Sequence, residues 1–259
     1  MPFAPDELTH DGFLGGALQV AQPANGYRAA TDPVLLAASV AAAPGDKVLE
    51  LGCGVGVAAL CLGCRISRLS LTGVEIQPDY ADLARQNSRT NEIGIQVVTA
   101  DIAELPMPLS RSTFDHILAN PPYYRAGQGT RAANPGRDRA LHEQTPLAVW
   151  LDVAARRLRP RGRLWMIGLS ERLPEMLAGL GEDMGSVEIL PVVARAGKPA
   201  GRVILTARKS GRAPFRLHSP LVMHEGAQHA GDRDSYTGLI RSVLRDGAGL
   251  GAWSVAGAQ

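Results

Sequence analysis

Hydrophobic and polar residues follow two different periods along the chain, and segments of the two kinds succeed one another regularly. Short apolar runs bounded by turn residues predict buried strands at residues 47–51, 69–75, 95–99, 114–119 and 163–168. Longer segments with a helical apolar period predict helices at residues 57–63, 78–91, 146–158 and 173–180. This alternation is typical of an α/β fold in which crossover helices connect the strands of a parallel sheet.

The last two strand-like segments depart from this alternation. Residues 187–193 and 202–207 follow each other without a helical segment between them. Consecutive strands joined by a short connection are usually antiparallel, because a parallel pair needs a long crossover. We therefore expect one antiparallel pair at the edge of an otherwise parallel sheet.

Length and composition favour one catalytic domain with additions at both ends. The chain has 259 residues and is 45% hydrophobic, which is enough for a core without disulfides. We expect an N-terminal extension at residues 1–45, the catalytic domain at 46–245 and a flexible tail at 246–259. No apolar run approaches the roughly 20 residues that span a bilayer, and the first residues do not resemble a signal peptide. The expected location is the cytoplasm.

The cysteines and histidines do not form a metal-binding pattern. Cys53, Cys61 and Cys64 are odd in number and lie in one apolar stretch, so we expect reduced, buried thiols and no metal. His116 lies in a strand pattern, which favours a hydrogen-bonded core histidine. The remaining candidates are expected in a surface loop, and they are His218, His224 and His229.

The net charge of +2 conceals two arginine-rich stretches, at residues 156–163 and 195–216. Arginine binds phosphate oxygens in a bidentate manner and stacks on bases, so a polyanionic partner such as RNA fits these stretches. A solvated basic surface with no partner is the alternative. The sequence is compatible with a monomer or a homodimer.

A glycine-rich turn lies directly after one predicted strand and before a helix. Its glycines are Gly52, Gly54 and Gly56, and Glu50 precedes them. Glycines in this context let the backbone approach a nucleotide-like ligand at a helix N-terminus. The third glycine comes too early for the dinucleotide pattern, and the spacing resembles the first motif of class I S-adenosylmethionine-dependent methyltransferases.

Acidic residues at the ends of the next two predicted strands fit the same resemblance. Glu75, followed by Ile76, is expected to accept the ribose hydroxyls, and Asp101 and Ile102 match the pair that meets the adenine of the cofactor. Each acid alone could be a solvated strand end or a helix cap. Together they follow consecutive strands, at the sheet edge where α/β proteins bind ligands.

A second motif, Asn120-Pro121-Pro122-Tyr123, follows the fourth predicted strand. It resembles the signature of methyltransferases that act on a planar nitrogen, namely adenine N6, cytosine N4 or a glutamine amide. The Asn120 side-chain oxygen and the Pro121 carbonyl can each accept one N–H of such a group. The two prolines stiffen the turn, and Tyr123 can stack on the flat substrate. The alternative is a proline-rich turn with a core tyrosine.

An apolar helix is expected to begin near Thr31 or Asp32, with one of these residues as its cap. Together with Tyr27 and Arg28, it could cover the methionine end of the cofactor. An ordinary N-terminal helix packed on the sheet is the alternative. Residues 127–139 are rich in glycine and arginine and are expected to form a lid, or else a disordered loop.

Together, the segment from Gly26 to Ala37, the glycine turn, the Asn-Pro-Pro-Tyr turn and residues 139–143 resemble one family. It comprises the bacterial tRNA adenine-N6 methyltransferases that modify the adenosine beside the anticodon of a valine tRNA. The resemblance implies a Rossmann-like, seven-stranded sheet that binds S-adenosylmethionine through Tyr27, Arg28, Thr31, Glu50, Gly52, Gly54, Gly56, Glu75, Ile76, Asp101, Ile102 and Asn120. Adenine would be held by Asn120, Pro121, Pro122 and Tyr123. From the arginine-rich stretches and the residues after the turn, RNA contacts are expected at Tyr124, Arg125, Arg131, Arg137, Arg195, Lys198 and Arg202.

Two other functions remain open on the sequence. The same tetrapeptide suits methylation of a glutamine side chain in a protein. A module that binds RNA in the presence of S-adenosylmethionine without methyl transfer is the non-enzymatic alternative, although the intact Asn120–Tyr123 turn favours transfer.

Overall fold

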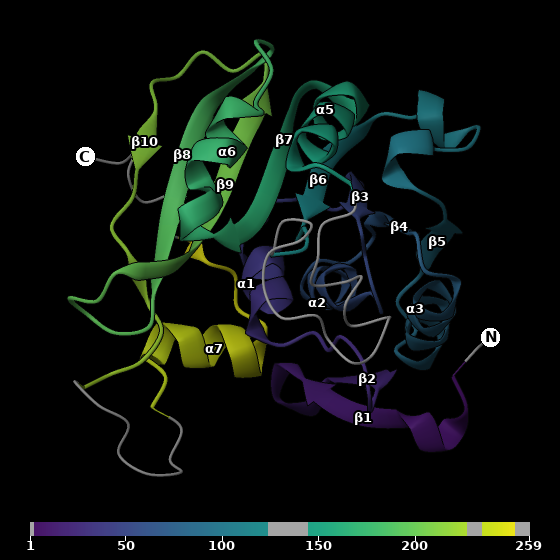
Figure 1. Ribbon diagram of the computed structural model, residues 1–259. Coiled ribbons are helices and arrows are strands. Elements are labelled where there is room, and N and C mark those ends of the chain that lie inside the picture. Colours follow the sequence, from purple (N-terminus) through teal and green to yellow (C-terminus); the bar gives the residue numbers. More distant parts are fainter. Residues whose placement is uncertain (1–2, 124–144, 227–234, 252–259) are drawn as a thin grey trace.

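A computed structural model describes residues 3–123, 145–226 and 235–251, and it shows a central sheet with helices on both faces (Figure 1). The sheet has nine strands in the order β10-β8-β9-β7-β6-β3-β4-β5, with β11 also paired to β8. Their bounds are β3 Lys47–Leu51, β4 Ser70–Glu75, β5 Ile95–Thr99, β6 Phe114–Ala119, β7 Leu158–Leu169, β8 Met184–Val193, β9 Ala200–Lys209, β10 Arg216–Leu217 and β11 Leu221–Val222. The α/β class expected from the alternating pattern is confirmed.

Strand β9 is the antiparallel member of this sheet, and it lies between β7 and β8. The expected antiparallel pairing of the last two long strands is present, but β9 is an inner strand and not an edge strand. The reason is its composition, because residues 203–207 are buried on both faces and fit only the interior of a sheet. The seven long strands match the expected number, and β10 and β11 add two-residue pairings outside β8.

The helices divide between the two faces of the sheet. α1, α2, α3 and α7 contribute to one apolar cluster and α5 and α6 to the other. Successive side chains along a strand point to opposite faces, so one strand contributes to both clusters. Val48 of β3 belongs to the first cluster and Leu49 to the second. The bounds are α1 Thr31–Ser39, α2 Val57–Arg65, α3 Pro78–Thr90, α5 Leu147–Arg157, α6 Leu173–Ala178 and α7 Gly238–Asp246. Short 3-10 turns are η1 Pro5–Glu7, η2 Leu14–Gly16, η3 Ile102–Glu104, η4 Leu109–Arg111 and η5 Ser170–Arg172.

The N-terminal extension contains a hairpin that the sequence pattern did not predict. β1 (Leu8–Phe13) and β2 (Leu18–Pro23) pair antiparallel and lie against the helices of the first face (Figure 1). Asn87 of α3 joins the hairpin in both directions, accepting from the Ala21 N–H at 2.8 Å and donating to the Ala21 carbonyl at 3.1 Å. The extension therefore shares the main core.

The C-terminal stretch is packed further than expected. Leu250 is 4% exposed, and its N–H donates to the Ala38 carbonyl at 2.7 Å. Residues 247–250 thus pack beside the end of α1, where the apolar side chain of Leu250 is part of the first cluster. The remainder of the expected tail, residues 252–259, lies outside the described residues.

Several single-residue expectations need correction. Cys53 and Cys61 are buried free thiols, but Cys64 is exposed because it lies in the last turn of α2. His218 is not in an open loop, since its Nε2 lies 2.8 Å from Glu188 Oε2, and the His224 ring stacks on Tyr236 at a centroid distance of 4.8 Å. His229 lies outside the described residues.

Two searches cover the described part of the chain. No helix there combines the length and the apolar character needed to cross a bilayer. Within the same ranges, no three His, Cys, Asp or Glu side chains are grouped so that they could hold a metal ion.

Candidate active site

A cleft opens at the carboxyl ends of the central parallel strands. β3 lies between β4 and β6 in the sheet, so connections leave the sheet on both sides of this point, as at the ligand sites of open α/β folds. The cleft encloses about 830 Å³ including its open mouth. Ten of the residues expected at the site line it, and they are Tyr27, Glu50, Gly52, Gly54, Glu75, Ile76, Asn120, Pro121, Pro122 and Tyr123.

The glycine turn between β3 and α2 forms the floor of this cleft. Gly52, Gly54 and Gly56 all have positive φ angles, of 63°, 53° and 90°. A Cβ at Gly54 would meet no atom within 4 Å, so this position leaves a space that a side chain would fill. At Gly52 a Cβ would lie 2.5 Å from the ring of Trp150, a residue of α5 that the sequence did not single out. The turn is therefore open on one side and supported by an aromatic ring on the other.

Two buried carboxylates hold the turn. Glu75 Oε2 accepts the Gly54 N–H and Oε1 accepts the Gln77 N–H, each at 2.9 Å. Glu50 Oε2 accepts the Ala59 N–H at 2.9 Å. Burial raises the pKa of Glu50 to about 8, and the nearby charge of Glu75 adds to that rise. These carboxylates connect the strand ends to the backbone around the cleft.

Asn120 lines the cleft and has an unused acceptor. Its Oδ1 is buried and has no hydrogen-bond partner among the described residues. Tyr27 lines the same cleft, and burial, followed by the charge of Asp32, raises its pKa to about 12. A buried acceptor without a partner costs roughly 1–3 kcal/mol. A ligand that donates an N–H at this point would recover that cost.

The ring of Tyr123 is held by residues from two other elements. Its hydroxyl donates to Asp32 Oδ2, and Arg202 Nε donates to the same oxygen at 2.9 Å. The Arg202 guanidinium carbon lies 4.5 Å from the centre of the Tyr123 ring, over its face. Burial, followed by the charge of Asp32, raises the pKa of the Tyr123 hydroxyl well above its usual range. The hydroxyl is therefore a permanent donor at neutral pH.

Arg172 supports the same turn from behind. It is buried, and its Nη1 donates to the Pro122 carbonyl at 3.0 Å. Glu175 of α6 binds the guanidinium at two points, 2.9 and 3.2 Å. The sequence did not point to Arg172, Glu175 or Trp150, because they lie on the elements after the motif and carry no motif of their own.

Other expected cofactor residues lie outside the lining of the cleft. Arg28 forms an ion pair with Asp11 at 2.6 Å, and the Asp101 side chain caps η3 by accepting the Ala103 N–H. Ile102 is buried in the second apolar cluster, and Gly56 is the N-cap of α2. Thr31 is the first residue of α1, whose N-cap is Ala30. The expected side-chain cap by Thr31 or Asp32 is therefore wrong, and Asp32 instead binds Tyr123 and Arg202.

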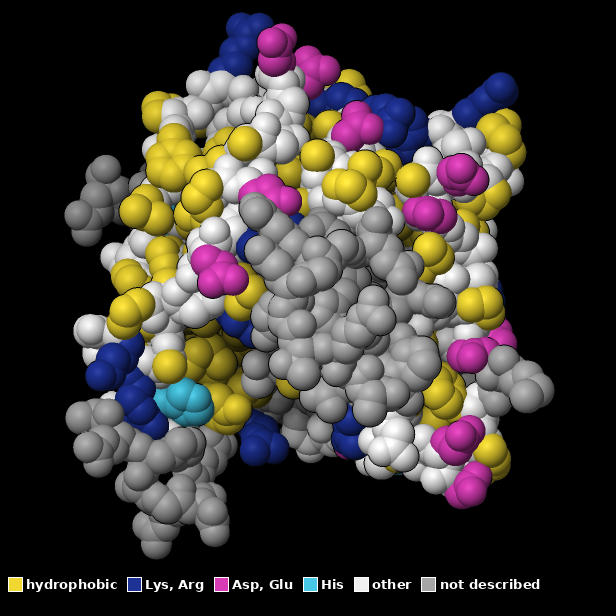
Figure 2. Space-filling view, viewed as in Figure 1, with side chains coloured by type: hydrophobic (Ala, Val, Ile, Leu, Met, Phe, Trp, Pro, Cys, Tyr) yellow, Lys and Arg dark blue, Asp and Glu magenta, His cyan; other side chains and the backbone are white. Residues whose placement is uncertain are grey.

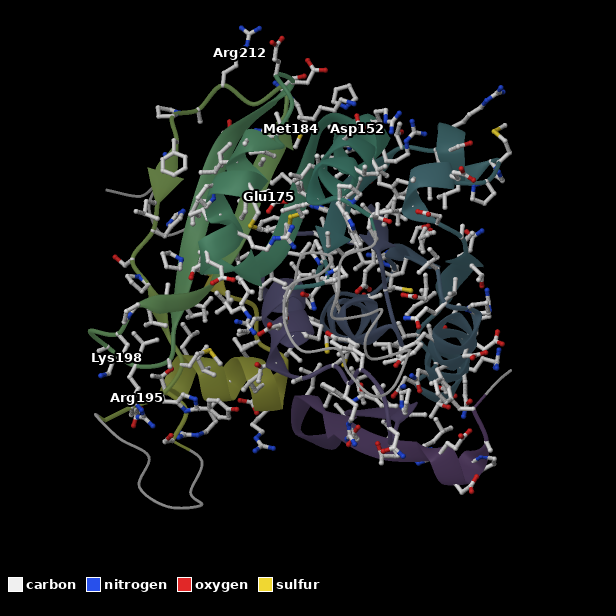
Figure 3. The ribbon with its side chains drawn as sticks, in the orientation of Figure 1. Asp152, Glu175, Met184, Arg195, Lys198 and Arg212 are labelled. Atoms are coloured by element: carbon white, nitrogen blue, oxygen red, sulfur yellow. The ribbon has the colours of Figure 1, made fainter. Side chains whose placement is uncertain are left out.

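The expected RNA-binding residues fall into separate places. Arg195 and Lys198 lie at the connection between β8 and β9, well away from Arg212 (Figure 3). This connection is at the sheet edge where β7 ends, because Arg202 of β9 is paired with Leu169. Arg202 is engaged with Asp32, and the other candidates fall outside the described residues, namely Tyr124, Arg125, Arg131 and Arg137.

The first arginine-rich stretch lies at the opposite edge, where β7 begins, and most of it is paired. Arg156 and Arg159 form ion pairs with Asp152 and Asp115, and Arg163 lies 3.3 Å from Glu188. On the face shown in Figure 2, Lys and Arg side chains form separate groups, with acidic side chains among them. Of these two arginine-rich stretches, as far as the structure describes them, only the β8–β9 connection lies at the end of the sheet where β7 ends.

Comparison with known proteins identifies the family. The model of the methyltransferase small domain matches residues 30–195, more than half of the chain. This chain belongs to the methyltransferase small domain family. A relative from Mannheimia succiniciproducens, named tRNA1(Val) (adenine(37)-N6)-methyltransferase, is 30% identical over 214 residues, covering 80% of this chain and 85% of the relative.

Further relatives of this methyltransferase carry the same name. The protein of Dickeya chrysanthemi is 29% identical over 247 residues, covering 92% of this chain and 94% of its own. The protein of Porphyromonas gingivalis is 33% identical over 158 residues, and the match spans 61% of its length. The family resemblance stated from the motifs is confirmed.

Solved structures agree on the fold of the methyltransferase. A structure from Agrobacterium tumefaciens, described as an O-methyltransferase, has a TM-score of 0.67 at 24% identity and covers 84% of this chain and 97% of that one. A methyltransferase from Pyrococcus furiosus has a TM-score of 0.55 at 18% identity, covering 75% and 90%. At these identities the likeness concerns the fold alone.

The family and fold imply S-adenosylmethionine as the methyl donor, and the cleft fits such a ligand. Because Gly54 has no side chain, a ligand atom can occupy the space that a Cβ would fill at this position. The cleft wall carries the carboxyl groups of Glu50 and Glu75 together with the exposed side chain of Ile76, which is suited to a flat ring. Acidic, apolar and backbone groups thus occur together, as a ligand with an amino group, hydroxyls and a base requires.

Proposed function

We propose that this protein transfers a methyl group from S-adenosylmethionine to the exocyclic N6 of an adenine in tRNA, in the cytoplasm. The observation that carries the proposal is that Asn120, which lines the cleft together with Pro121 and Tyr123, has a buried side-chain oxygen without a hydrogen-bond partner among the described residues. A planar amino group has two N–H bonds to offer, and Asn120 has a buried acceptor that needs one. The names of the relatives support adenine N6 of tRNA as the acceptor.

The main role of the protein in this reaction would be to position the acceptor nitrogen against the methyl group. S-adenosylmethionine, when bound, would supply a methyl group on a positively charged sulfur. As the nitrogen–carbon bond formed, the carbon–sulfur bond would break, S-adenosylhomocysteine would leave with its electron pair, and the nitrogen would release one proton to solvent. The amino nitrogen of adenine is a weak nucleophile because its lone pair is delocalised into the ring. Asn120 Oδ1 and the Pro121 carbonyl would accept its two N–H bonds and direct the lone pair toward the methyl carbon. Holding reacting atoms in line supplies most of the rate in such transfers.

The turn has features suited to this role. Both prolines restrict the backbone, and Arg172 holds the Pro122 carbonyl, so the Asn120 and Pro121 acceptors keep their directions. Tyr123 offers a ring on which the base can stack. The target base must leave its own stack to reach the turn, which costs least in a single-stranded loop. Arg195 and Lys198 are placed to meet phosphates at the same sheet edge.

The test measures methyl transfer to tRNA transcripts that lack modifications, with N6-methyladenosine identified by mass spectrometry. Asn120→Ala should lower kcat by at least about 100-fold, as for loss of one preorganised polar contact in other active sites. Asn120→Asp keeps an acceptor oxygen and should retain more activity than Asn120→Ala. Binding of S-adenosylmethionine, measured by calorimetry, controls for folding.

Three outcomes would contradict the proposal. An Asn120→Ala protein with undiminished transfer would exclude the role of Asn120. Transfer of label to a protein glutamine, with no RNA binding even at low salt, would favour the other acceptor, because RNA binding must weaken steeply as salt rises. RNA binding without release of S-adenosylhomocysteine would indicate a binding module.

A further inference from the structure

Three side chains from distant parts of the chain meet beside the Asn-Pro-Pro-Tyr turn. Asp32 lies in the first turn of α1, Tyr123 follows β6, and Arg202 lies near the start of β9. Asp32 Oδ2 accepts from both the Tyr123 hydroxyl and Arg202 Nε, although Asp32 and Arg202 are 170 residues apart. The guanidinium of Arg202 also covers one face of the Tyr123 ring at 4.5 Å.

The group is mostly removed from solvent and its charges are balanced. The side chains of Asp32 and Arg202 are 18% and 32% exposed. Asp32 and Arg202 neutralise each other, so a phosphate could recruit Arg202 only by breaking its bond to Asp32. Arg202 is thus engaged by Asp32 beside the turn, whereas Lys198 lies on the exposed connection that precedes β9.

We propose that Asp32 and Arg202 are positioning residues that fix the Tyr123 ring, so that a flat acceptor stacks on the face opposite the guanidinium. The acceptor part of this inference rests on the proposed function. A tyrosine ring turns about two side-chain bonds, and contacts at both its hydroxyl and its face are needed to stop both rotations. The hydroxyl is held by Asp32, and the face is held by Arg202.

In this arrangement, one face of the Tyr123 ring contacts Arg202 and the opposite face is the one proposed to bind the acceptor. A cation over an aromatic face is attracted by the ring electrons and excludes a second flat group from that face. Because Tyr123 also lines the cleft, its opposite face would define a single plane for the acceptor. Since the reacting nitrogen must align with the methyl group, a fixed plane favours the reactive geometry.

The alternative is that the three side chains only join α1 to β9. In that case, substitutions would lower thermal stability and affect every ligand alike. A positioning role predicts a selective effect on the acceptor, with binding of S-adenosylmethionine unchanged. The two roles are therefore separable by comparing KM for the acceptor with Kd for the cofactor.

The kinetic experiment uses Asp32→Asn, Arg202→Met, Tyr123→Phe and the double variant Asp32→Asn/Tyr123→Phe in the full chain. Each single change should raise the acceptor KM by about 10-fold, while the Kd for S-adenosylmethionine stays within about twofold. The double variant should be no worse than the poorer single one, because both changes remove one interaction. Additive losses, or equal effects on cofactor and acceptor, would overturn the proposal.

Matched controls change the same residue types at positions away from the Asp32, Tyr123 and Arg202 group. Arg208→Gln changes another arginine of β9, whose Nε bonds the Arg161 carbonyl at 3.2 Å near the far edge of the sheet. Asp152→Asn changes an exposed acid of α5 that is paired with Arg156. Both should leave the acceptor KM unchanged, and a rise as large as in Asp32→Asn would show that the effect is not specific.

A second readout does not depend on catalysis. With tyrosines labelled by carbon-13 at the ζ position, Tyr123→Phe identifies the Tyr123 signal in the NMR spectrum. Asp32→Asn should shift that signal, because it removes the charge at the hydroxyl. An unmoved signal would overturn the positioning pair. A wild-type protein that methylates no RNA would instead defeat the proposed function, while the NMR result would still decide whether Asp32 holds Tyr123.

Discussion

At the scale of single residues, the hydrogen bonds of the buried His116 side chain determine which of its ring nitrogens carries the proton. His116 of β6 accepts the Trp165 Nε1–H at Nδ1, at 3.1 Å, and its Nε2 lies 3.2 Å from Asp46 Oδ2. Tryptophan can only donate, so Nδ1 carries no proton and Nε2 donates to Asp46. The expectation of a hydrogen-bonded core histidine is confirmed. Burial lowers the pKa of His116, although Asp46 opposes this shift.

His116 should make the protein less stable in mild acid. Its pKa in the folded state is below the ordinary value of 6.5 in the unfolded chain. The stabilisation from neutral His116 is therefore complete above pH 6.5 and is lost as the pH falls through the folded-state pKa. One such group changes the free energy of unfolding by at most about 1.4 kcal/mol per pH unit.

Urea unfolding between pH 7.5 and 5 measures this effect. The His116→Gln variant lacks the titrating group, so its free energy of unfolding should change less with pH below 6.5 than that of the wild type. The other histidines are common to both proteins and cancel in the comparison. Identical pH profiles would show that His116 does not titrate in this range.

At the scale of elements, the cleft depends on the contact between the glycine turn and α5. The sequence predicted the strand, turn and helix around Gly52, since their pattern is local. The support that Trp150 gives to the turn comes from a helix nearly a hundred residues later, and only packing reveals it. The β1–β2 hairpin was missed for a related reason, because its attachment to the fold depends on contacts with α3, a distant part of the chain.

Alanine at two glycines of this turn should have different consequences. Gly52→Ala forces a Cβ against the rigid Trp150 ring at a positive φ, and should cost about 2–4 kcal/mol of stability. Gly54→Ala meets no protein atom, so its cost should be only about 1–2 kcal/mol, from the positive φ. Its methyl group would instead enter the cleft and weaken cofactor binding.

Thermal unfolding and calorimetric titration with S-adenosylmethionine distinguish the two variants. The larger drop in melting temperature is expected for Gly52→Ala. Gly54→Ala should keep most of its stability and lose affinity. If both lost stability equally and Gly54→Ala bound the cofactor normally, the space above Gly54 would not belong to the cofactor site.

At the scale of the whole molecule, helices from the N-terminal and C-terminal parts of the chain, α1 and α7, pack together on one face of the sheet. α7 lies beside α1 (Figure 1), and Ile240 and Val243 are fully buried in the same apolar cluster as Leu35 and Leu36. The C-terminal helix therefore covers the helix that carries Asp32. Because one cluster includes α1, α2 and α7, we expect a single cooperative unfolding transition.

Ile240→Ala should lower the free energy of unfolding of the whole chain by about 2–4 kcal/mol, because it leaves a cavity in the shared core. The neighbouring Leu239 is 48% exposed on the same helix, so Leu239→Ala should change stability by less than about 0.5 kcal/mol. Denaturant unfolding followed by circular dichroism measures both. A separate early transition in Ile240→Ala would show that α7 unfolds independently.

The features that could be predicted from the sequence are those that depend on residues close together in the chain. Apolar periodicity indicated the seven long strands and the helices between them, and the glycine and proline turns indicated a ligand site at their ends. Such patterns are visible because side-chain spacing and turn chemistry are local properties.

Tertiary packing alone decided which distant groups meet. It placed β9 inside the sheet, paired Asp32 with Tyr123 and Arg202, and brought Arg172 and Trp150 to the two turns. It also separated Arg202 from Arg195 and Lys198, which look alike in the sequence. Hydrogen bonds between residues up to 170 positions apart leave no periodic trace, so only the folded chain reveals them.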